Sequence, residues 1–214
     1  MLTHMRALLL LALGPLLLSA CSSKGITQVR AQVRGWSGGA GQIRVLARDQ
    51  TVLASTSLDS AGRFTLPLPS AQALSPFLRP SLLADTPPNC TSSVTSSDPA
   101  AQFYQINQLS AFPASGTVPL PLVSQTRSDN PGGAQRLDQR TLIYASTATR
   151  VQGERRCPVT PASGAAAQAT TSFALNLKAG WNYAVSHQGQ DAGGTGTARL
   201  ESVGDDGFEG WAAL

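Results

Sequence analysis

The sequence is short of charge, of aromatic side chains and of the residue types that bind metals. Of its 214 residues, 13% are charged, 6% are aromatic, two are histidines (His4 and His187) and three are cysteines. So few histidines and cysteines, without a CxxC motif, exclude the usual zinc sites and disfavour dithiol redox chemistry. No apolar run reaches the roughly 20 residues of a membrane-spanning helix. No glycine-rich loop ending in lysine indicates a phosphate site.

The surplus of positive charge is small and scattered. The formal net charge is +4, and most basic residues are single arginines within strand-like segments. The densest basic stretch, Glu154–Arg156, is more simply explained as a solvated strand end. Because nucleic-acid-binding surfaces gather their arginines and lysines in one patch, we expect no nucleic-acid partner.

The first 20 residues have the features of a signal peptide. A short start that carries Arg6 is followed by an apolar run from Ala7 to Leu18, and small residues come next. That run has the length of a signal-peptide core. The helix-breaking pair Gly14-Pro15 would present the following stretch to a peptidase in extended form. The alternatives are an ordinary signal peptide that is cut nearby, or a buried helix.

The stretch "LSAC" at positions 18–21 resembles the lipobox of bacterial lipoproteins. The resemblance implies cleavage before Cys21, acylation of that cysteine and anchoring of the chain in membrane lipid. Two or three acyl chains anchor a protein stably, whereas one binds only marginally. Ser22, which is not an aspartate, implies export to an outer membrane where one is present. We therefore expect a signal peptide over 1–20 and a lipid-anchored tether over 21–25, leaving the chain in the cell envelope.

The two remaining cysteines, Cys90 and Cys157, are expected to form a disulfide, since an exported chain is exposed to oxidising conditions. Such a bridge would close a long loop and contribute about 4 kcal/mol in the loop-entropy model. Both cysteines stand in loop-like surroundings, "PPNCTSS" and "ERRCPVT", so the bridge is predicted to join two loops. The alternative is two free thiols.

Apolar and polar residues alternate with period two through region 26–85, which predicts β-strands. Strands are expected at 28–36, 42–48, 51–58 and 63–69, arranged as a meander or half-sandwich. Pro67 and Pro69 cannot donate ladder hydrogen bonds, so the last strand is predicted to be at an edge. One or two helical turns are expected after it, broken by Pro76 and Pro80.

Residues 86–101 form a Pro/Ser/Thr-rich stretch that predicts a loop, and a second β region is expected over 102–214. Its strand-like stretches are 102–112, 116–124, 140–151, 171–177, 181–185, 197–203 and 208–214. The glycine-containing stretch Lys178–Gly180 predicts a hairpin between the fourth and fifth of these. Residues 157–169 are expected to be a loop.

The stretch from Val33 to Pro69 is similar to carboxypeptidase-regulatory-like domains of the transthyretin-like sandwich type. Val33–Gly35, Ile43–Val45 and Thr56–Leu66 occupy the places of that family's valine-x-glycine, valine-rich strand and "T..D..G.F.L". The resemblance implies a structural or binding module and brings no catalytic set. We predict an all-β fold with little helix: a transthyretin-like or immunoglobulin-like β-sandwich, followed by a second β-sandwich-like unit that either has its own core or shares the first one.

No catalytic constellation is predicted. "GWSGG" around Ser37 fits a nucleophile elbow, but a strand pattern follows where an elbow requires a helix. As a base, His187 would need Ser37 or another hydroxyl and an orienting acid such as Asp191. An exposed loop position explains it more simply. A turn likewise explains Asp205, Asp206 and Glu209 better than a calcium site does.

Trp36, Trp181 and Trp211 each stand beside a glycine at a strand end and form a candidate ligand or partner surface, although core packing is the commoner use of such residues. The sequence thus predicts a lipid-anchored envelope protein without metal or cofactor. Its expected role is structural or binding, toward another envelope protein or a polysaccharide. The alternatives are a small-ligand carrier and a small envelope hydrolase.

Overall fold

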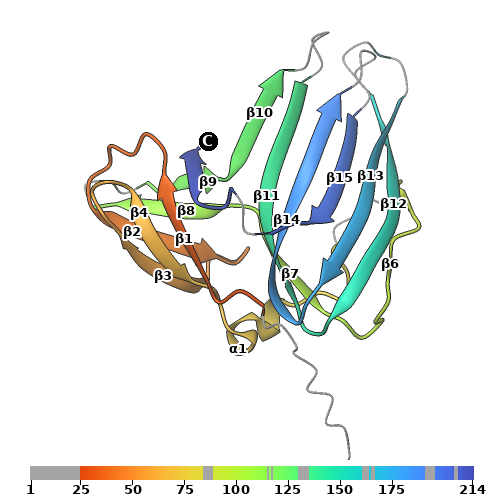
Figure 1. The fold of residues 1–214 in the computed structure, drawn as a ribbon, viewed down its shortest axis with the longest axis horizontal. Helices are drawn as coiled ribbons and strands as arrows, with labels where there is room; N and C mark the ends of the chain where they lie inside the picture. The colour runs from red at the N-terminus through yellow and green to blue at the C-terminus, as the bar shows by residue number, and fades with distance from the viewer. Residues whose placement is uncertain are drawn as a thin grey trace, which may run out of the picture.

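A computed structural model describes residues 25–83, 89–114, 116, 118–129, 135–160, 164, 167–190, 196–204 and 207–214. These residues form two curled sheets and very little helix, so the predicted all-β class is confirmed. Figure 1 shows the smaller first sheet on the left and the longer strands of the second sheet on the right. Among the helices of the described residues, none is long and apolar enough to cross a bilayer.

The first sheet has seven strands and curls back on itself. In spatial order they are β3 (Val52–Leu58), β2 (Gly41–Leu46), β8 (Leu109–Pro113), β9 (Leu120–Val123), β16 (Gly210–Ala213), β1 (Gln28–Val33) and β4 (Arg63–Pro67). The two end strands, β3 and β4, lie side by side and are joined by a turn. The Asp59 carboxylate stabilises this turn by accepting hydrogen bonds from the backbone N–H groups of Ala61 and Arg63, at 2.9 and 2.8 Å.

The four predicted strands of the N-terminal region are confirmed, but their pairing as a meander is wrong. β1 pairs with β4, β2 pairs with β3, and β8, β9 and β16 separate the two pairs. Those three strands come from the region predicted over 102–214, so the sheets do not divide at the 86–101 loop. β4 pairs on one side only, which confirms the edge position expected from Pro67.

The second sheet has nine strands, several of them eleven residues long. Its spatial order is β10 (Gln125–Asp129), β11 (Gln135–Ala145), β14 (Gly180–Gln190), β15 (Gly196–Ser202), β13 (Ala167–Leu177), β12 (Thr149–Val159) and β5 (Thr91–Ser92), with β6 (Thr95–Ser96) on β12 and β7 (Phe103–Ile106) on β11. The loop predicted over 157–169 is shorter than expected, because its two ends belong to β12 and β13.

The predicted hairpin across Lys178–Gly180 is wrong. β13 and β14 leave this turn but do not pair, because β15 lies between them, parallel to β13 and antiparallel to β14. β13 and β14 therefore diverge from the turn, and the amide of Asn182, which is 9% exposed, lies between them beside the turn. Its Nδ2 donates to the Lys178 and Gly180 carbonyls at 2.9 Å, and its Oδ1 accepts from the Lys178 N–H at 2.8 Å.

The segment after β4 forms the predicted helical turns, α1 (Ala71–Leu74) and the 3₁₀ turn η1 (Ser75–Phe77). Leu74 of α1 is fully buried, so the helix covers part of the core. Cys90 and Cys157 are bridged. The expectation that the bridge joins two loops is corrected, because Cys157 lies within β12 and Cys90 directly precedes β5, which pairs with β12. The bridge therefore joins an edge segment to its neighbouring strand.

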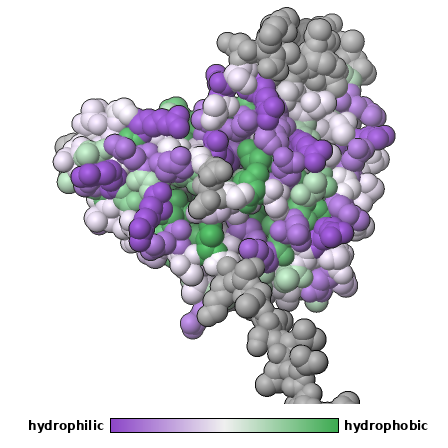
Figure 2. Space-filling model, viewed as in Figure 1, coloured by the Kyte–Doolittle hydropathy of each residue, from purple (hydrophilic) through white to green (hydrophobic). Residues whose placement is uncertain are grey.

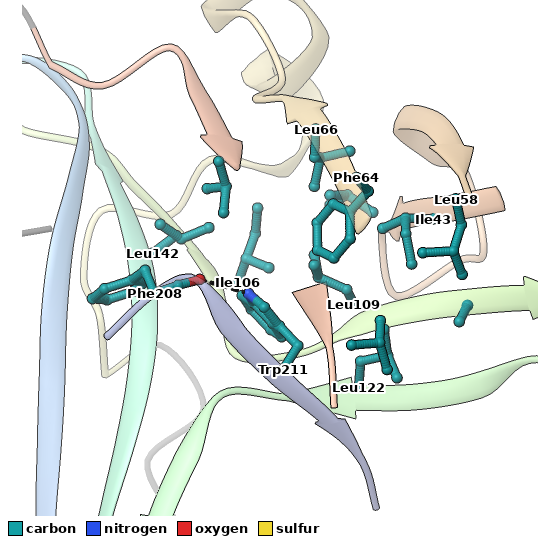
Figure 3. Close-up of a cluster of buried hydrophobic side chains, with 14 of the residues drawn as sticks. Ile43, Leu58, Phe64, Leu66, Ile106, Leu109, Leu122, Leu142, Phe208 and Trp211 are labelled. Atoms are coloured by element: carbon teal, nitrogen blue, oxygen red, sulfur yellow. Dashed lines mark hydrogen bonds between the residues drawn. The ribbon is translucent and has the colours of Figure 1, made fainter. Parts of the chain in front are cut away.

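One hydrophobic cluster joins the two sheets. Side chains from both sheets contribute to it, including Ile43, Phe64, Leu142 and Trp211, as Figure 3 shows. A second cluster covers the opposite face of the second sheet. It contains Ile143 and Ala145 of β11, which alternate along the strand with Leu142 and Tyr144 of the first cluster. Figure 2 shows hydrophobic residues at the centre of the molecule, over the junction of the sheets.

We expect Asn182→Ala to lower the free energy of unfolding by about 2 kcal/mol, because the backbone groups of the Lys178–Gly180 turn would lose their buried partners. Urea unfolding followed by tryptophan fluorescence measures the change. The matched control is Asn176→Ala on the neighbouring end of β13, where the side chain is exposed. Its effect should stay within about 0.5 kcal/mol. Equal losses in both variants would contradict the structural role of the Asn182 amide.

Candidate functional site

A cleft of about 690 Å³ lies where the turn after β2, the α1–η1 segment and the β7–β8 connection meet. Its lining includes Arg48, Gln50, Phe77, Arg79, Tyr104 and Gln108. The volume lies within the range of roughly 300–1,000 Å³ that is typical of ligand pockets. Aromatic rings, amides and guanidinium groups together suit a ligand that has both apolar faces and hydrogen-bonding edges.

Tyr104 is held firmly on one side of this cleft. It lies in β7 opposite Tyr144 of β11, and its ring meets Trp181 edge-on at a centroid distance of 6.4 Å. Burial raises the pKa of the Tyr104 hydroxyl; the negative charge of Asp49 adds to this shift and Arg48 opposes it. The hydroxyl therefore stays protonated at neutral pH and is available as a hydrogen-bond donor.

Polar side chains on the β7 side of the cleft are ordered by one another. Gln105 Nε2 donates to Asn107 Oδ1 at 2.8 Å and to Thr141 Oγ1 at 3.2 Å. Thr141 Oγ1, which is buried, lies 2.7 Å from Asn107 Oδ1. Because these contacts fix the amides before any ligand arrives, binding would cost less side-chain entropy there.

Gln50 at the cleft has an unusual backbone conformation. Its φ is +68°, in the left-handed region that glycine adopts most easily. The turn is closed by hydrogen bonds from the Gln50 N–H to the Ala47 carbonyl and from the Ala47 N–H to the Thr51 carbonyl. The left-handed backbone of a non-glycine residue costs of order 1 kcal/mol of conformational free energy. Here it places the amide of Gln50 beside the cleft.

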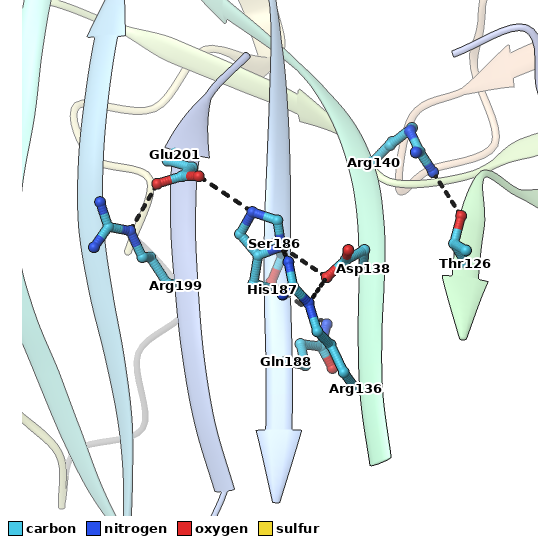
Figure 4. A network of polar contacts seen from close by, with 9 residues as sticks. All are labelled: Thr126, Arg136, Asp138, Arg140, Ser186, His187, Gln188, Arg199 and Glu201. Atoms are coloured by element: carbon cyan, nitrogen blue, oxygen red, sulfur yellow. Dashed lines mark hydrogen bonds and ion pairs between the residues drawn. The ribbon is translucent and has the colours of Figure 1, made fainter. Parts of the chain in front are cut away.

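A row of charged side chains crosses the second sheet on β11, β14 and β15, as Figure 4 shows. His187 is opposite Asp138 on one side and Arg199 on the other. Its Nδ1 lies 2.7 Å from Asp138 Oδ1, and its Nε2 lies 3.2 Å from Glu201 Oε1. Arg136 pairs with Asp138, while Arg199 pairs with Glu201 at 2.7 Å. Each carboxylate of the row therefore lies between His187 and an arginine.

The arginines lower the pKa of both carboxyl groups in this row. Partial burial would raise the pKa of Asp138, but hydrogen bonds from Arg136 and His187 outweigh it and the net shift is downward. The hydrogen bond from Arg199 lowers the pKa of Glu201. With its proton on Nδ1, the imidazole of His187 donates to Asp138; the other tautomer accepts at Nδ1 from Arg136, whose Nη2 is 2.8 Å away.

The expected loop position of His187 is corrected, because His187 lies within β14 and its side chain is 26% exposed. Ser37 is exposed in the β1–β2 connection of the first sheet, and no hydrogen bond joins it to His187 within the described residues. Asp191 lies outside the described residues. Asp138 was missed from the sequence because its pairing with His187 is set by the β11–β14 register, 49 residues apart.

The tryptophan surface is corrected as well. Trp181 and Trp211 are only 4% and 0% exposed, and each indole N–H donates to a backbone carbonyl, of Pro69 and Phe208 respectively. They are core residues. Trp36 is partly exposed, and its indole N–H donates to the Gly39 carbonyl at 2.7 Å.

A smaller groove of about 390 Å³ lies at the far end of the second sheet, between β10–β11 and β13. Leu137, Thr171 and Arg127 contribute to its lining. On β12, Arg155 lies opposite Thr171, and its buried Nε has no hydrogen-bond partner. A buried donor without a partner is uncommon, and this one lies next to a residue of the groove.

The remaining predicted positions are divided between described and undescribed residues. Cys21, Asp205 and Asp206 lie outside the described residues, and Glu209 is exposed beside β16. Arg156 and Glu154 form an exposed ion pair at 2.8 Å. Within the described part of the chain, no group of three or more His, Cys, Asp and Glu side chains is placed to hold a metal ion. Neither a protein-family model, nor a curated protein, nor a solved structure matches this chain.

The charged row predicts how stability depends on pH. Because the folded protein lowers the pKa of Asp138 and Glu201, the unfolded chain takes up protons first as the pH falls. The free energy of unfolding should therefore decrease between about pH 5 and pH 3. In Asp138→Asn this decrease should be smaller. Urea unfolding at several pH values measures it, with Ser128→Ala, an exposed variant next to the row, as control. An unchanged slope in Asp138→Asn would contradict this assignment.

Proposed function

We propose that this protein is an exported, lipid-anchored protein of the cell envelope that binds another envelope component, a protein or a polysaccharide, without catalysis. The cleft beside Tyr104 is its binding site. The observation that carries the proposal is the cleft itself, because its polar groups are ordered by internal hydrogen bonds and its volume suits a ligand.

The chemistry of the cleft favours recognition of polar groups on an extended partner. Gln50, Gln108 and Arg79 supply donors and acceptors near the opening, and Phe77 supplies an apolar ring. A sugar ring or a peptide segment presents both kinds of surface. His187, the histidine of the described residues, is engaged by two carboxylates away from the cleft lining, which supports binding rather than His-dependent hydrolysis.

The envelope location rests on the sequence around Cys21, and one structural feature is compatible with it. The Cys90–Cys157 bridge suits an exported chain, because disulfides persist in oxidising compartments. Acylation of Cys21 would supply the membrane anchor, with an outer membrane favoured where one exists. The transthyretin-like resemblance of the first strands agrees with a binding module.

Carriage of a small ligand is the second candidate function. The groove near Leu137 is smaller than the cleft. Arg155, whose Nε is unpartnered, pairs in register with Thr171 of the groove and donates from Nη2 to its hydroxyl at 3.5 Å. A carboxylate or another acceptor of a bound molecule would satisfy the Nε donor. Native mass spectrometry of protein purified from its own cells tests this candidate, which predicts a retained small mass.

We expect Gln108→Trp to abolish partner capture, because a large ring at this exposed position would fill the opening of the cleft without touching the core. Cross-linking in intact cells, followed by affinity purification and mass spectrometry, measures capture. The matched control is Thr65→Trp on the exposed face of β4, which should capture as the unchanged protein does. Equal capture by both variants would exclude the cleft as the binding site.

Cys21→Ala is the control for anchoring in the same experiment. We expect it to leave the membrane fraction and to lose the partners that depend on the envelope location. Mass spectrometry of the unchanged protein should find acyl chains on Cys21. A chain without them, or a Cys21→Ala variant that keeps its membrane location and partners, would contradict the proposed anchor.

A further inference from the structure

The described chain begins at one end of the second sheet and is held there. Gly25 lies against the β13–β14 turn so closely that an added Cβ would be 2.7 Å from the Trp181 carbonyl oxygen and 3.0 Å from that of Ala179. No side chain fits at this contact. The next residue, Ile26, donates its backbone N–H to the Trp181 carbonyl at 3.0 Å. In Figure 1 this is the lower end of the molecule, beside α1.

The same end gathers short polar connections between strands. Ser146, which follows β11, exchanges hydrogen bonds with the backbone of Gln102, and Thr147 donates to the Asp98 carboxylate at 2.6 Å. Lys178 is exposed in the β13–β14 turn. The surface at this end is therefore polar and closed by its own hydrogen bonds.

Among the described residues, the one lysine, Lys178, lies at this end. The sequence holds two lysines, Lys24 and Lys178, and its other basic residues are all arginines. Lys24 directly precedes Gly25, and Lys178 belongs to the turn against which Gly25 lies. Among the described residues at this end, the Asp98 carboxylate is already bonded to Thr147 and to the Ala100 N–H. The end therefore favours an anionic partner.

We infer that the β13–β14 end of the second sheet rests on the bilayer and contacts its anionic lipid headgroups. This inference rests on the proposed acylation of Cys21. Only the three residues 22–24 separate that cysteine from Gly25, a span of four residue steps. At no more than about 3.6 Å per residue, they reach at most roughly 14 Å. The lipid anchor therefore keeps this end next to the membrane.

The orientation also places the two candidate sites. Strands β11 to β14 are eleven residues long, so the far end of the sheet lies about 35 Å from the near end. The groove, lined by Gly189 and Gly196, belongs to that far end. The cleft, lined by Phe77 and Phe103, belongs to the near end, because Phe103 follows the Gln102 that bonds Ser146. The protein would therefore bind a partner in the cleft close to the lipid surface.

The test uses the acylated full-length protein in vesicles of phosphatidylcholine with a minority of phosphatidylglycerol. A fluorophore is attached in turn to Ala148→Cys at the near end and to Thr197→Cys at the far end, both exposed positions. A lipid with a spin-labelled headgroup quenches fluorophores that lie near the membrane. We expect quenching at position 148 to exceed that at position 197 several-fold. Equal quenching, or stronger quenching at 197, would overturn the orientation.

Two further variants distinguish the effect of the short tether on the quenching from the effect of the Lys178 charge. A flexible Gly-Ser insertion after Lys24 should bring the two quenching values together, because the near end is then free to leave the surface. Lys178→Glu should lower quenching at position 148 in the anionic vesicles and leave it unchanged in pure phosphatidylcholine. The same loss in both vesicle types would overturn the headgroup contact.

Mass spectrometry of the same samples keeps the two proposals distinct. If Cys21 carries no acyl chain, the proposed anchor fails and the orientation fails with it. If Cys21 is acylated and the protein sits on the vesicles, equal quenching at the two positions rejects the orientation alone. The proposed binding role would then stand without it.

Discussion

The placement of the last strand, β16, is the constraint on which the rest of the structure depends. Trp211 is fully buried, and its backbone carbonyl accepts from the Arg34 N–H at 2.6 Å while the Glu209 carbonyl accepts from the Gln32 N–H at 2.7 Å. β16 thereby lies parallel to β1 and antiparallel to β9. Without it, two strands of the first sheet would expose unpaired edges, which are templates for unwanted pairing.

This placement also brings the sheets together and so creates the cleft. Phe208 precedes β16 and packs against Tyr183 of the second sheet at a centroid distance of 4.2 Å. Trp181, which lies in β14 with Tyr183, donates its indole N–H to the carbonyl of Pro69. Pro69 is two residues before the start of α1. The α1–η1 segment is thus held against the second sheet, and the cleft forms where it faces the turn after β2. Both the core and the cleft depend on contacts between distant parts of the chain.

Local chemistry in the sequence was sufficient to predict the strands but not their partners. Alternation with period two predicted β1 to β4, and prolines predicted the edge position of β4, because both signals act within a few residues. The placement of β15 between β13 and β14 depends on β13–β15 pairs that are 27 positions apart and on the buried amide of Asn182. A hairpin signal at Lys178–Gly180 contains none of that information.

The candidate site was harder to predict than the fold for the same reason. The pairing of Cys90 with Cys157 followed from their number alone, since only two cysteines remain after Cys21. The cleft combines Arg48, Phe77 and Tyr104, which belong to three separate segments. The partners of His187 come from strands whose register the sequence does not reveal. Tryptophans beside glycines indicated a surface, although two of the three are core residues.

The sequence of the second sheet nevertheless contains a change from apolar to ionisable residues along two strands. This change marks the part of the sheet that the first sheet covers. Alternate residues of β14, from Trp181 through Tyr183 and Val185 to His187, point to one face and change from apolar to ionisable. β11 changes in the same direction from Tyr144 to Asp138, since the two strands run antiparallel. The apolar ends lie under the first sheet and the ionisable ends lie beyond it. Such a gradient along two strands marks the boundary of a covering layer, because burying a charge without a partner is costly and exposing apolar rings forgoes the hydrophobic effect.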